Sequence, residues 1–270
     1  MNNSDLHAIF FIIPTKNRWN NVRKLLGEIQ QQLYGCPYKL FMIIVNDTFY
    51  KNSENTIKDI PDIFEYNIIQ LKKNYGQRLA TMIGVKQAAD YAFAKNVLTE
   101  KTIFITMDDD GGHPAQALEN MIAAFKNNKT KTLAYASPIY TNTIRSFGSS
   151  INHIFFRISF RLQPDVKIGS FRAFPAKLAY EALNLPVSYP YLSAMLLSCH
   201  PETKMVYFNK HTKMETGAKS TYSLLKLANI WLKLFIFWGP FKALGKIIRI
   251  PSVFDDQRYI YRKSTGNIDE

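Results

Sequence analysis

Apolar runs alternate with stripes of helical spacing along the first 140 residues. The runs are of strand length and contain few polar residues, as expected for strands buried on both faces of a parallel sheet. They occupy residues 8–14, 40–45, 67–71, 102–107 and 133–137. Helical patterns lie between them, over residues 20–33 and 77–94 and from Pro114 onward. This alternation predicts an α/β fold with a mostly parallel sheet and right-handed crossovers.

The second half of the chain has a different pattern. A helical stripe covers residues 145–161, and strands are predicted over residues 167–174 and 206–211. A long apolar helix is predicted from about residue 220. A short helix follows it, and this helix carries Lys242, Lys246 and Arg249 on one face.

Polar residues follow directly after four of the predicted strands. In parallel sheets, ligands bind at the carboxyl ends of the strands, so these residues are the first candidates for a functional site. They lie at residues 15–17, 46–47, 73–76 and 108–110.

Three consecutive aspartates follow the fourth predicted strand. So much negative charge at one strand end is unfavourable unless cations neutralise it. Carboxylates favour Mg²⁺ or Mn²⁺. Side-chain alternation places Asp108 and Asp110 on one side and Asp109 on the other. The following Gly111 and Gly112 allow close approach of a ligand. The alternative is an acidic loop that only precedes the helix at Pro114.

Six motifs, in order, resemble the family-2 glycosyltransferases, and within them the branch of dolichol-phosphate mannose synthases and bacterial polyprenyl-phosphate glycosyltransferases. The resemblance covers roughly residues 8–230 and implies a GT-A-type, Rossmann-like fold with helices on both faces of the sheet. It also implies a nucleoside-diphosphate sugar as donor. The motifs are IIPTKNR (12–18), IIVND (43–47), KKNYGQRLATMIGVKQA (72–88), MDDDGGHP (107–114), GSFRAF (169–174) and GAKSTYSLLKL (217–227).

The resemblance implies roles for individual residues. The base and ribose pocket would be lined by Pro14, Thr15, Asn17 and Asp47. Three more residues would lie near the nucleotide: Asn74, Gly76 and Gln77. They stand at the start of a helix whose positive end favours the diphosphate. Asp108 and Asp110 would hold the metal on the diphosphate and stabilise the leaving nucleotide, which makes them catalytic.

The chain departs from the family pattern at three places. Asn46 stands where an acid is usual, and Gly112 stands where a Gln ligand is usual, so water or His113 would complete the metal site. The Arg that usually precedes the last motif has no clean match, since Lys213 or Met214 falls there and the motif is one residue longer. These changes leave donor specificity and metal affinity open.

The acceptor is predicted from a missing acid. A neutral hydroxyl acceptor needs a general base. The family resemblance implies that this acid would fall within about residues 185–200, which contain no Asp or Glu. A phosphate acceptor is already anionic and needs cations and hydrogen-bond donors instead. The candidates are Arg145, Ser149, Arg172, Lys213, Lys219 and Ser220, and Arg172 would also be catalytic. Each basic residue could equally be a solvated surface charge.

Composition supports an anionic partner. The net charge is +13 and the pI is about 9.6, which favours nucleic acid, anionic lipid or a phosphorylated substrate. A solvated basic surface remains the alternative. The two cysteines lack metal-site spacing, which indicates a reducing cytoplasm. The N-terminus is expected to be a strand and not a signal peptide.

The apolar segment at residues 224–241 is interrupted by Lys226, Asn229 and Lys233 and closed by Pro240. It falls short of the ~20 apolar residues that a membrane span needs. Together with the basic helix after it, the segment is typical of a helix lying in the membrane surface. The alternative is a helix packed on the catalytic domain.

We therefore expect a catalytic domain over residues 1–219, with a nucleotide-binding half (1–140) and an acceptor half (141–219). Amphipathic helices at the membrane interface (220–254) and a polar tail (255–270) would follow. The predicted activity is inverting, metal-dependent sugar transfer to a polyprenyl (undecaprenyl- or dolichyl-type) phosphate for cell-surface glycan synthesis. The enzyme would be peripheral on the cytoplasmic face of the membrane.

Two alternatives remain open at this stage. One is a glycosyltransferase acting on a hydroxyl of a surface polysaccharide or lipid-linked oligosaccharide. The other is a non-catalytic basic module that binds membrane or nucleic acid, although the sequence has no RNP-like pattern and no nucleic-acid partner is expected. Self-association of the chain is also left open.

Overall fold

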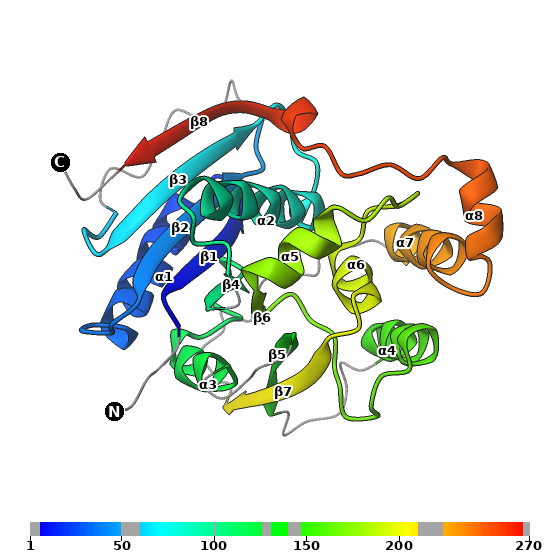
Figure 1. The fold of residues 1–270 in the computed structure, drawn as a ribbon, viewed down its shortest axis with the longest axis horizontal. Helices are drawn as coiled ribbons and strands as arrows, with labels where there is room; N and C mark the ends of the chain where they lie inside the picture. The colour runs from blue at the N-terminus through cyan, green and yellow to red at the C-terminus, as the bar shows by residue number, and fades with distance from the viewer. Residues whose placement is uncertain are drawn as a thin grey trace.

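A computed structural model describes residues 6–49, 60–99, 101–125, 131–139, 147–209 and 224–266. Its described strands form one sheet in the order β7-β5-β6-β4-β1-β2-β3-β8 (Figure 1). The strands are β1 (Ala8–Thr15), β2 (Lys39–Asn46), β3 (Phe64–Leu71), β4 (Thr102–Thr106), β5 (Thr132–Ile139), β6 (Arg172–Pro175), β7 (Glu202–Asn209) and β8 (Ile260–Gly266).

The centre of the sheet is parallel. β1 pairs in parallel with β2 and β4, and β2 pairs in parallel with β3. β6 inserts antiparallel between β4 and β5, while β5 and β7 are again parallel. This arrangement confirms the predicted α/β class with a mostly parallel sheet.

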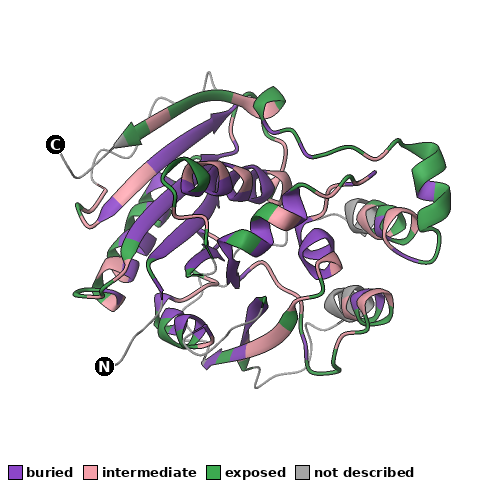
Figure 2. Ribbon diagram, viewed as in Figure 1, coloured by how far each residue is buried: buried purple, intermediate pink, exposed green. Residues whose placement is uncertain are grey.

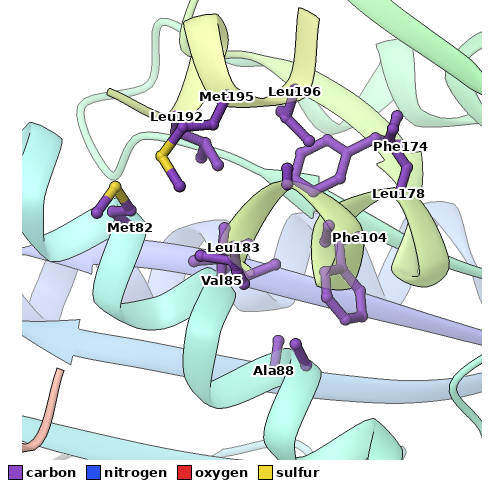
Figure 3. Packing of buried hydrophobic residues seen from close by; sticks show 14 of the residues in the cluster. Met82, Val85, Ala88, Phe104, Phe174, Leu178, Leu183, Leu192, Met195 and Leu196 are labelled. Carbon is purple, nitrogen blue, oxygen red and sulfur yellow. The ribbon is translucent and has the colours of Figure 1, made fainter. Parts of the chain in front are cut away.

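Helices cover both faces of the sheet, as predicted. Along β1, Phe10 and Ile12 face one core, while Phe11 and Ile13 face the other. The first core packs under α2, α5 and α6 (Figure 3) and the second under α1 and α3. The helices are α1 (Trp19–Gln32), α2 (Gln77–Ala94), η2 (Ala115–Ala117), α3 (Leu118–Ala123), α4 (Phe147–Phe160), α5 (Ala176–Leu183), α6 (Leu192–Ser198), α7 (Leu224–Phe237), α8 (Lys242–Ile248) and η3 (Gln257–Tyr259).

Helix α2 approaches the sheet closely because a glycine faces it. A Cβ at Gly84 would lie 2.5 Å from Ile12 Cγ2 and 3.0 Å from Val45 Cγ2, closer than side chains tolerate. The close packing fixes α2 over β1 and β2. Its N-terminus, at Gly76 with φ +92°, therefore lies near the carboxyl ends of those strands.

The last two helices are partly packed and partly exposed. Leu234 of α7 is fully buried, and Trp238 Nε1 donates to the carbonyl of Tyr189 at 2.8 Å. The outer side of α7 and most of α8 are exposed (Figure 2). In the described part of the chain, no helix is long and apolar enough to cross a bilayer.

The expected polar tail is partly a strand. Residues 257–259 form a 3₁₀ turn, and β8 pairs antiparallel with β3 at the edge of the sheet. The sequence of this tail is polar because most of β8 is exposed at the edge of the sheet. The chain therefore returns from α8 to the main sheet. A strand of that sheet lies beyond residue 219, where the catalytic domain was predicted to end. Helices α5 and α6 were also not predicted.

Candidate active site

The candidate site lies at the carboxyl edge of the central strands. Backbone bonds continue the strand ladders into it: Asp47 N donates to the Thr15 carbonyl at 2.8 Å, and Met107 N donates to the Ile12 carbonyl at 3.0 Å. The loops after β1, β2 and β4 therefore start from fixed positions. The topology that was predicted from the sequence brings these distant segments together.

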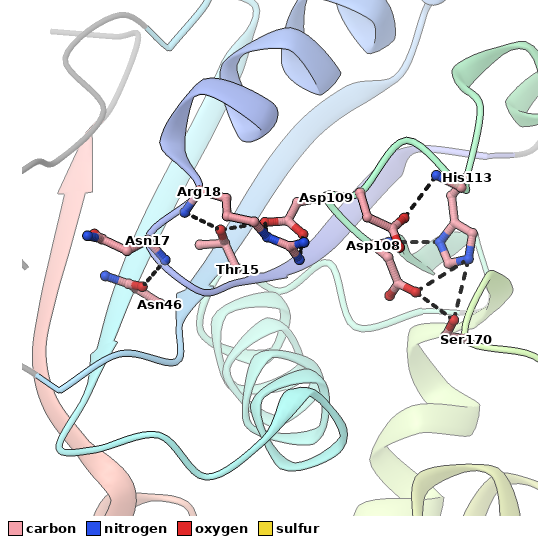
Figure 4. A network of polar contacts seen from close by, with 10 residues as sticks. Thr15, Asn17, Arg18, Asn46, Asp108, Asp109, His113 and Ser170 are labelled. Carbon is pink, nitrogen blue, oxygen red and sulfur yellow. Dashed lines mark hydrogen bonds and ion pairs between the residues drawn. The ribbon is translucent and has the colours of Figure 1, made fainter. Parts of the chain in front are cut away.

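Asp109, the middle aspartate, faces away from its neighbour Asp108 (Figure 4). Its carboxylate accepts hydrogen bonds from Thr15 Oγ1 at 2.6 Å and Arg18 Nε at 3.0 Å, and Arg18 also forms an ion pair with it. Burial raises the pKa of Asp109, and the Thr15 hydrogen bond and Arg18 oppose that shift. Asp109 therefore joins β4 to the loop after β1. The Thr15 hydroxyl, predicted to line the nucleotide pocket, is engaged in this contact.

Asp108 points toward the segment that leads into β6. Ser170 Oγ donates to Asp108 Oδ2 at 2.9 Å, and the Asp108 backbone N–H donates to His113 Nδ1 at 2.7 Å. His113 Nε2 lies 3.5 Å from Asp108 Oδ2, and the ring stacks on Phe171 with centroids 4.7 Å apart. Burial lowers the pKa of His113, so the ring is neutral near pH 7.

Asp110 is exposed, and its Oδ1 accepts a hydrogen bond from Gly112 N at 2.9 Å. Gly111 has φ +75°, a conformation that favours glycine and turns the loop sharply after the carboxylate. The three aspartates therefore differ: one is buried and ion-paired, one is held by neighbours, and one faces solvent.

Asp47 anchors the loop between β3 and α2. Its carboxylate accepts hydrogen bonds from the backbone N–H groups of Tyr75 at 2.6 Å and Gly76 at 2.7 Å. Burial raises the pKa of Asp47, while these two hydrogen bonds and nearby Lys16 oppose the shift. This bonding places the N-terminus of α2 beside the end of β2.

Asn46 performs a similar task on the other side of β2. Its Oδ1 accepts from the Asn17 backbone at 3.0 Å and its Nδ2 donates to Gln70 Oε1 at 2.8 Å. Sequence reasoning treated Asn46 only as a departure and missed Gln70. The other predicted nucleotide-site residues divide into buried Pro14 and the exposed Asn17, Asn74 and Gln77.

Arg172, the first residue of β6, is buried with an exposed fraction of 6%. Its Nη1 donates to Ser193 Oγ at 2.5 Å, and its Nε has no hydrogen-bond partner within the described structure. Tyr135, its partner across the β5–β6 pair, is fully buried, and its hydroxyl lies beside Arg172 and Ser193. Burial raises the pKa of Tyr135 to about 12, against the positive charge of Arg172.

The family model described as glycosyl transferase family 2 matches residues 10–190. The chain belongs to this glycosyltransferase family. The glycosyltransferase is 20% identical over 256 residues to the Bacillus subtilis (strain 168) protein named "Putative glycosyltransferase CsbB", covering 91% of this chain and 74% of that one. It is 26% identical over 116 residues to the dolichol-phosphate mannosyltransferase of Pyrococcus furiosus, covering 43% of this chain but only 29% of that enzyme.

Solved structures confirm the predicted GT-A fold of the glycosyltransferase. The glucosyl-3-phosphoglycerate synthase of Mycobacterium tuberculosis superposes with a TM-score of 0.53 at 10% identity, covering 97% of this chain and 88% of that one. That synthase was crystallised with Mn²⁺, uridine diphosphate and phosphoglyceric acid. At this identity, the likeness establishes the shared fold alone.

The carboxylates at this site of the glycosyltransferase fit a divalent ion that is bound partly by the phosphates of a nucleotide. Asp108 and Asp110 offer two carboxylates, and Mg²⁺ usually takes one or two carboxylates plus phosphate oxygens and water. Within the described ranges, no three His, Cys, Asp or Glu side chains form a metal-binding group. His113 was predicted as a further ligand, and in the structure both its ring nitrogens face Asp108.

Several predicted acceptor residues of the glycosyltransferase cannot be placed. Four of them lie outside the described residues: Arg145, Lys213, Lys219 and Ser220. Ser149 lies in the first part of α4, in which the side chains are not described. In contrast, the structure adds Ser170, Ser193 and Tyr135, which sequence reasoning missed. Ser170 lies within the GSFRAF motif and Tyr135 on a predicted strand, whereas nothing in the sequence marked Ser193.

Proposed function

We propose that this glycosyltransferase moves a sugar from a nucleoside-diphosphate sugar to a lipid phosphate of the polyprenyl type, with inversion at the anomeric carbon. The observation that carries the proposal is Arg172, a buried guanidinium with an unpaired Nε. It lies two residues from Ser170, which contacts the candidate metal ligand Asp108. A phosphate bound at Arg172 would therefore lie close to the donor.

A buried cation needs a counter-charge. Removing an arginine from water is costly unless an anion and hydrogen bonds compensate. Among the described residues, Arg172 forms no ion pair, and its neighbours Tyr135 and Ser193 are neutral. Phosphate oxygens accept hydrogen bonds from arginine in a bidentate geometry. An anionic acceptor would supply the missing counter-charge and a partner for the Arg172 Nε.

The stretch where a base was expected offers no acid. Residues 185–200 contain no Asp or Glu, and their contribution near Arg172 is the neutral Ser193. An ionised phosphate does not have to lose a proton before it attacks, so this arrangement suits it better than a hydroxyl acceptor.

The proposed reaction is a single displacement. One acceptor phosphate oxygen attacks the anomeric carbon, a carbon–oxygen bond forms, and the bond to the nucleoside diphosphate breaks on the opposite face. A divalent ion held by Asp108 and Asp110 would neutralise the charge that develops on the leaving diphosphate. The N-terminus of α2, at Gly76, would add its positive end to the same diphosphate.

We further infer that α7 and α8 lie on an anionic membrane surface. Apolar side chains there are exposed, including Ile247 at 82% and Ile250 at 83%. The charged residues Lys242, Lys246 and Arg249 lie among them and are also exposed. Exposed apolar and basic residues together favour the headgroup region of anionic bilayers, where a lipid acceptor would be available. The match to the dolichol-phosphate mannosyltransferase supports the same acceptor class, although it covers less than a third of that enzyme.

Replacing Ile247 and Ile250 together by Ser should weaken vesicle binding at least tenfold. Burying one such side chain contributes about 1.5–3 kcal/mol. The measurement is co-sedimentation with vesicles containing anionic phospholipid. Tyr34, 83% exposed after helix α1, provides a matched control, and Tyr34→Ser should bind as the wild type does. Equal binding by the Ile247/Ile250 variant would contradict the membrane role of α8.

The function itself is tested by comparing two lipid acceptors with acceptor-free vesicles, each with and without an added oligosaccharide. The full chain is incubated with Mn²⁺, a panel of radiolabelled nucleoside-diphosphate sugars, and vesicles containing undecaprenyl phosphate, undecaprenol or no acceptor. We expect label in a lipid fraction only with undecaprenyl phosphate, through an acid-labile sugar–phosphate bond. Transfer to added oligosaccharide without any lipid phosphate product would overturn the proposed acceptor.

A further inference from the structure

Two successive residues before β6 support Asp108, one by direct contact and one through His113. Ser170 Oγ donates a hydrogen bond to Asp108 Oδ2, and the Phe171 ring stacks at 18° on the His113 ring, which itself touches Asp108. The segment is fixed from the other side as well, because Thr106 Oγ1 donates to the Ser170 carbonyl. Ser170 is therefore held in place just before β6, the strand that pairs with β4.

The orientation of His113 follows from its partners. Its Nδ1 accepts the backbone N–H of Asp108 at 2.7 Å, so Nδ1 carries no hydrogen. The hydrogen of the neutral ring is then on Nε2, which lies 3.5 Å from Asp108 Oδ2 and 3.4 Å from Ser170 Oγ. His113 therefore presents a donor to this carboxylate, and neither nitrogen offers a free lone pair to a cation (Figure 4).

The two candidate metal ligands are consequently held to different degrees. The Asp108 side chain is only 15% exposed, and two groups converge on its Oδ2. No described protein atom hydrogen-bonds to its other oxygen, Oδ1. Asp110 is exposed and its carboxylate has one described hydrogen bond, within its own turn.

We propose that Ser170 and His113 are positioning residues that hold Asp108 by Oδ2 and leave Oδ1 directed at the divalent ion. This inference rests on the proposed function, since it presumes that Asp108 binds the ion. Partners that orient a metal-binding side chain typically contribute 10- to 100-fold in metal affinity. The roles are distinct: Asp108 binds, Ser170 and His113 orient, and Asp110 completes the site from solvent.

The test measures Mn²⁺ affinity directly, by calorimetry in the presence of UDP or GDP, whichever the wild type binds more tightly. Ser170→Ala should weaken Mn²⁺ binding about tenfold, while Ser170→Thr, which keeps the hydroxyl, should bind nearly as the wild type does. Ser198 is a matched control because its hydroxyl contacts only the Ala194 carbonyl of its own helix. Ser198→Ala should leave Mn²⁺ affinity unchanged.

Kinetics separate positioning from a general structural effect. Ser170→Ala should require more Mn²⁺ for half-maximal rate yet regain most of its kcat at saturating Mn²⁺, with an unchanged Tm. Unaltered Mn²⁺ affinity in Ser170→Ala would overturn the proposal. A wild type that binds no Mn²⁺ with either nucleotide would instead overturn the metal site, and with it the proposed function.

Pulsed electron paramagnetic resonance tests His113 independently. A histidine nitrogen bound directly to Mn²⁺ would give a strong coupling that changes when histidine is labelled with ¹⁵N. We expect no such coupling in the wild type, because His113 is expected to act through Asp108. A strong coupling from a directly bound histidine nitrogen that disappears in His113→Asn would make His113 a ligand and overturn its positioning role.

Discussion

Turnover should fall about a thousandfold when Asp110 is replaced by Asn. The substitution keeps the size of the side chain and removes one of the two charges available to a divalent ion. Metal stabilisation of a leaving group contributes several kcal/mol, and each 1.36 kcal/mol corresponds to about tenfold in rate. Because Asp110 is exposed and its hydrogen bond within the described structure lies in its own turn, the Tm should change little. The measurement is kcat at saturating donor and Mn²⁺.

The neighbouring aspartate provides the control for this prediction. Asp109 differs from Asp110 in facing Thr15 and Arg18 and in being 2% exposed. Asp109→Asn should therefore lower the Tm by weakening the contact between β4 and the β1 loop, while the Mn²⁺ dependence of the rate stays the same. Near wild-type turnover of Asp110→Asn at saturating Mn²⁺ would exclude the metal role of this residue.

The donor side of the site could be predicted because its residues follow strands that can be recognised from continuous apolar runs. β1, β2 and β4 form the parallel centre of the sheet, so residues after each strand must meet at one edge. This reasoning predicted that Asp47 and Asp108 follow strands at the same edge of the sheet, and β2 and β4 do both pair in parallel with β1. It did not show which atoms each would contact, and Thr15 proved to bond Asp109.

The acceptor side could not be predicted to the same depth because its strands are not in parallel order. β6 is four residues long and antiparallel to both neighbours, and the sequence pattern does not determine which strands flank it. The pairing of Tyr135 with Arg172 and the contact of Ser170 with Asp108 both depend on that insertion. β8 was missed for a different reason, since an exposed edge strand lacks the apolar alternation that marks a half-buried one.

Arg172→Met should leave the protein at least as stable and yet impair transfer. Methionine has a similar length and is apolar, and replacing buried charge by apolar groups is often neutral or stabilising. The free energy of unfolding in urea is therefore expected to stay constant or to rise by about 1 kcal/mol. A residue retained for packing would show the opposite result, because its loss would lower stability.

The kinetic loss should appear in the acceptor parameters. Hydrogen bonds to charged groups contribute about 1.5–3 kcal/mol, so kcat/KM for undecaprenyl phosphate should fall about 10- to 100-fold. Nucleotide binding, measured by thermal shift with UDP or GDP and Mn²⁺, should be unchanged, since Arg172 bonds to Ser193 on the acceptor side.

Arg172→Lys separates charge from geometry. Lysine keeps the positive charge but lacks the planar fork that binds two phosphate oxygens at once, so its activity should lie between those of the wild type and Arg172→Met. If Arg172→Met were as active as the wild type on undecaprenyl phosphate, the anion would have to bind elsewhere. A variant that gains stability while losing only acceptor use would mean that the buried charge at Arg172 is kept for its ligand, at some cost to the free protein.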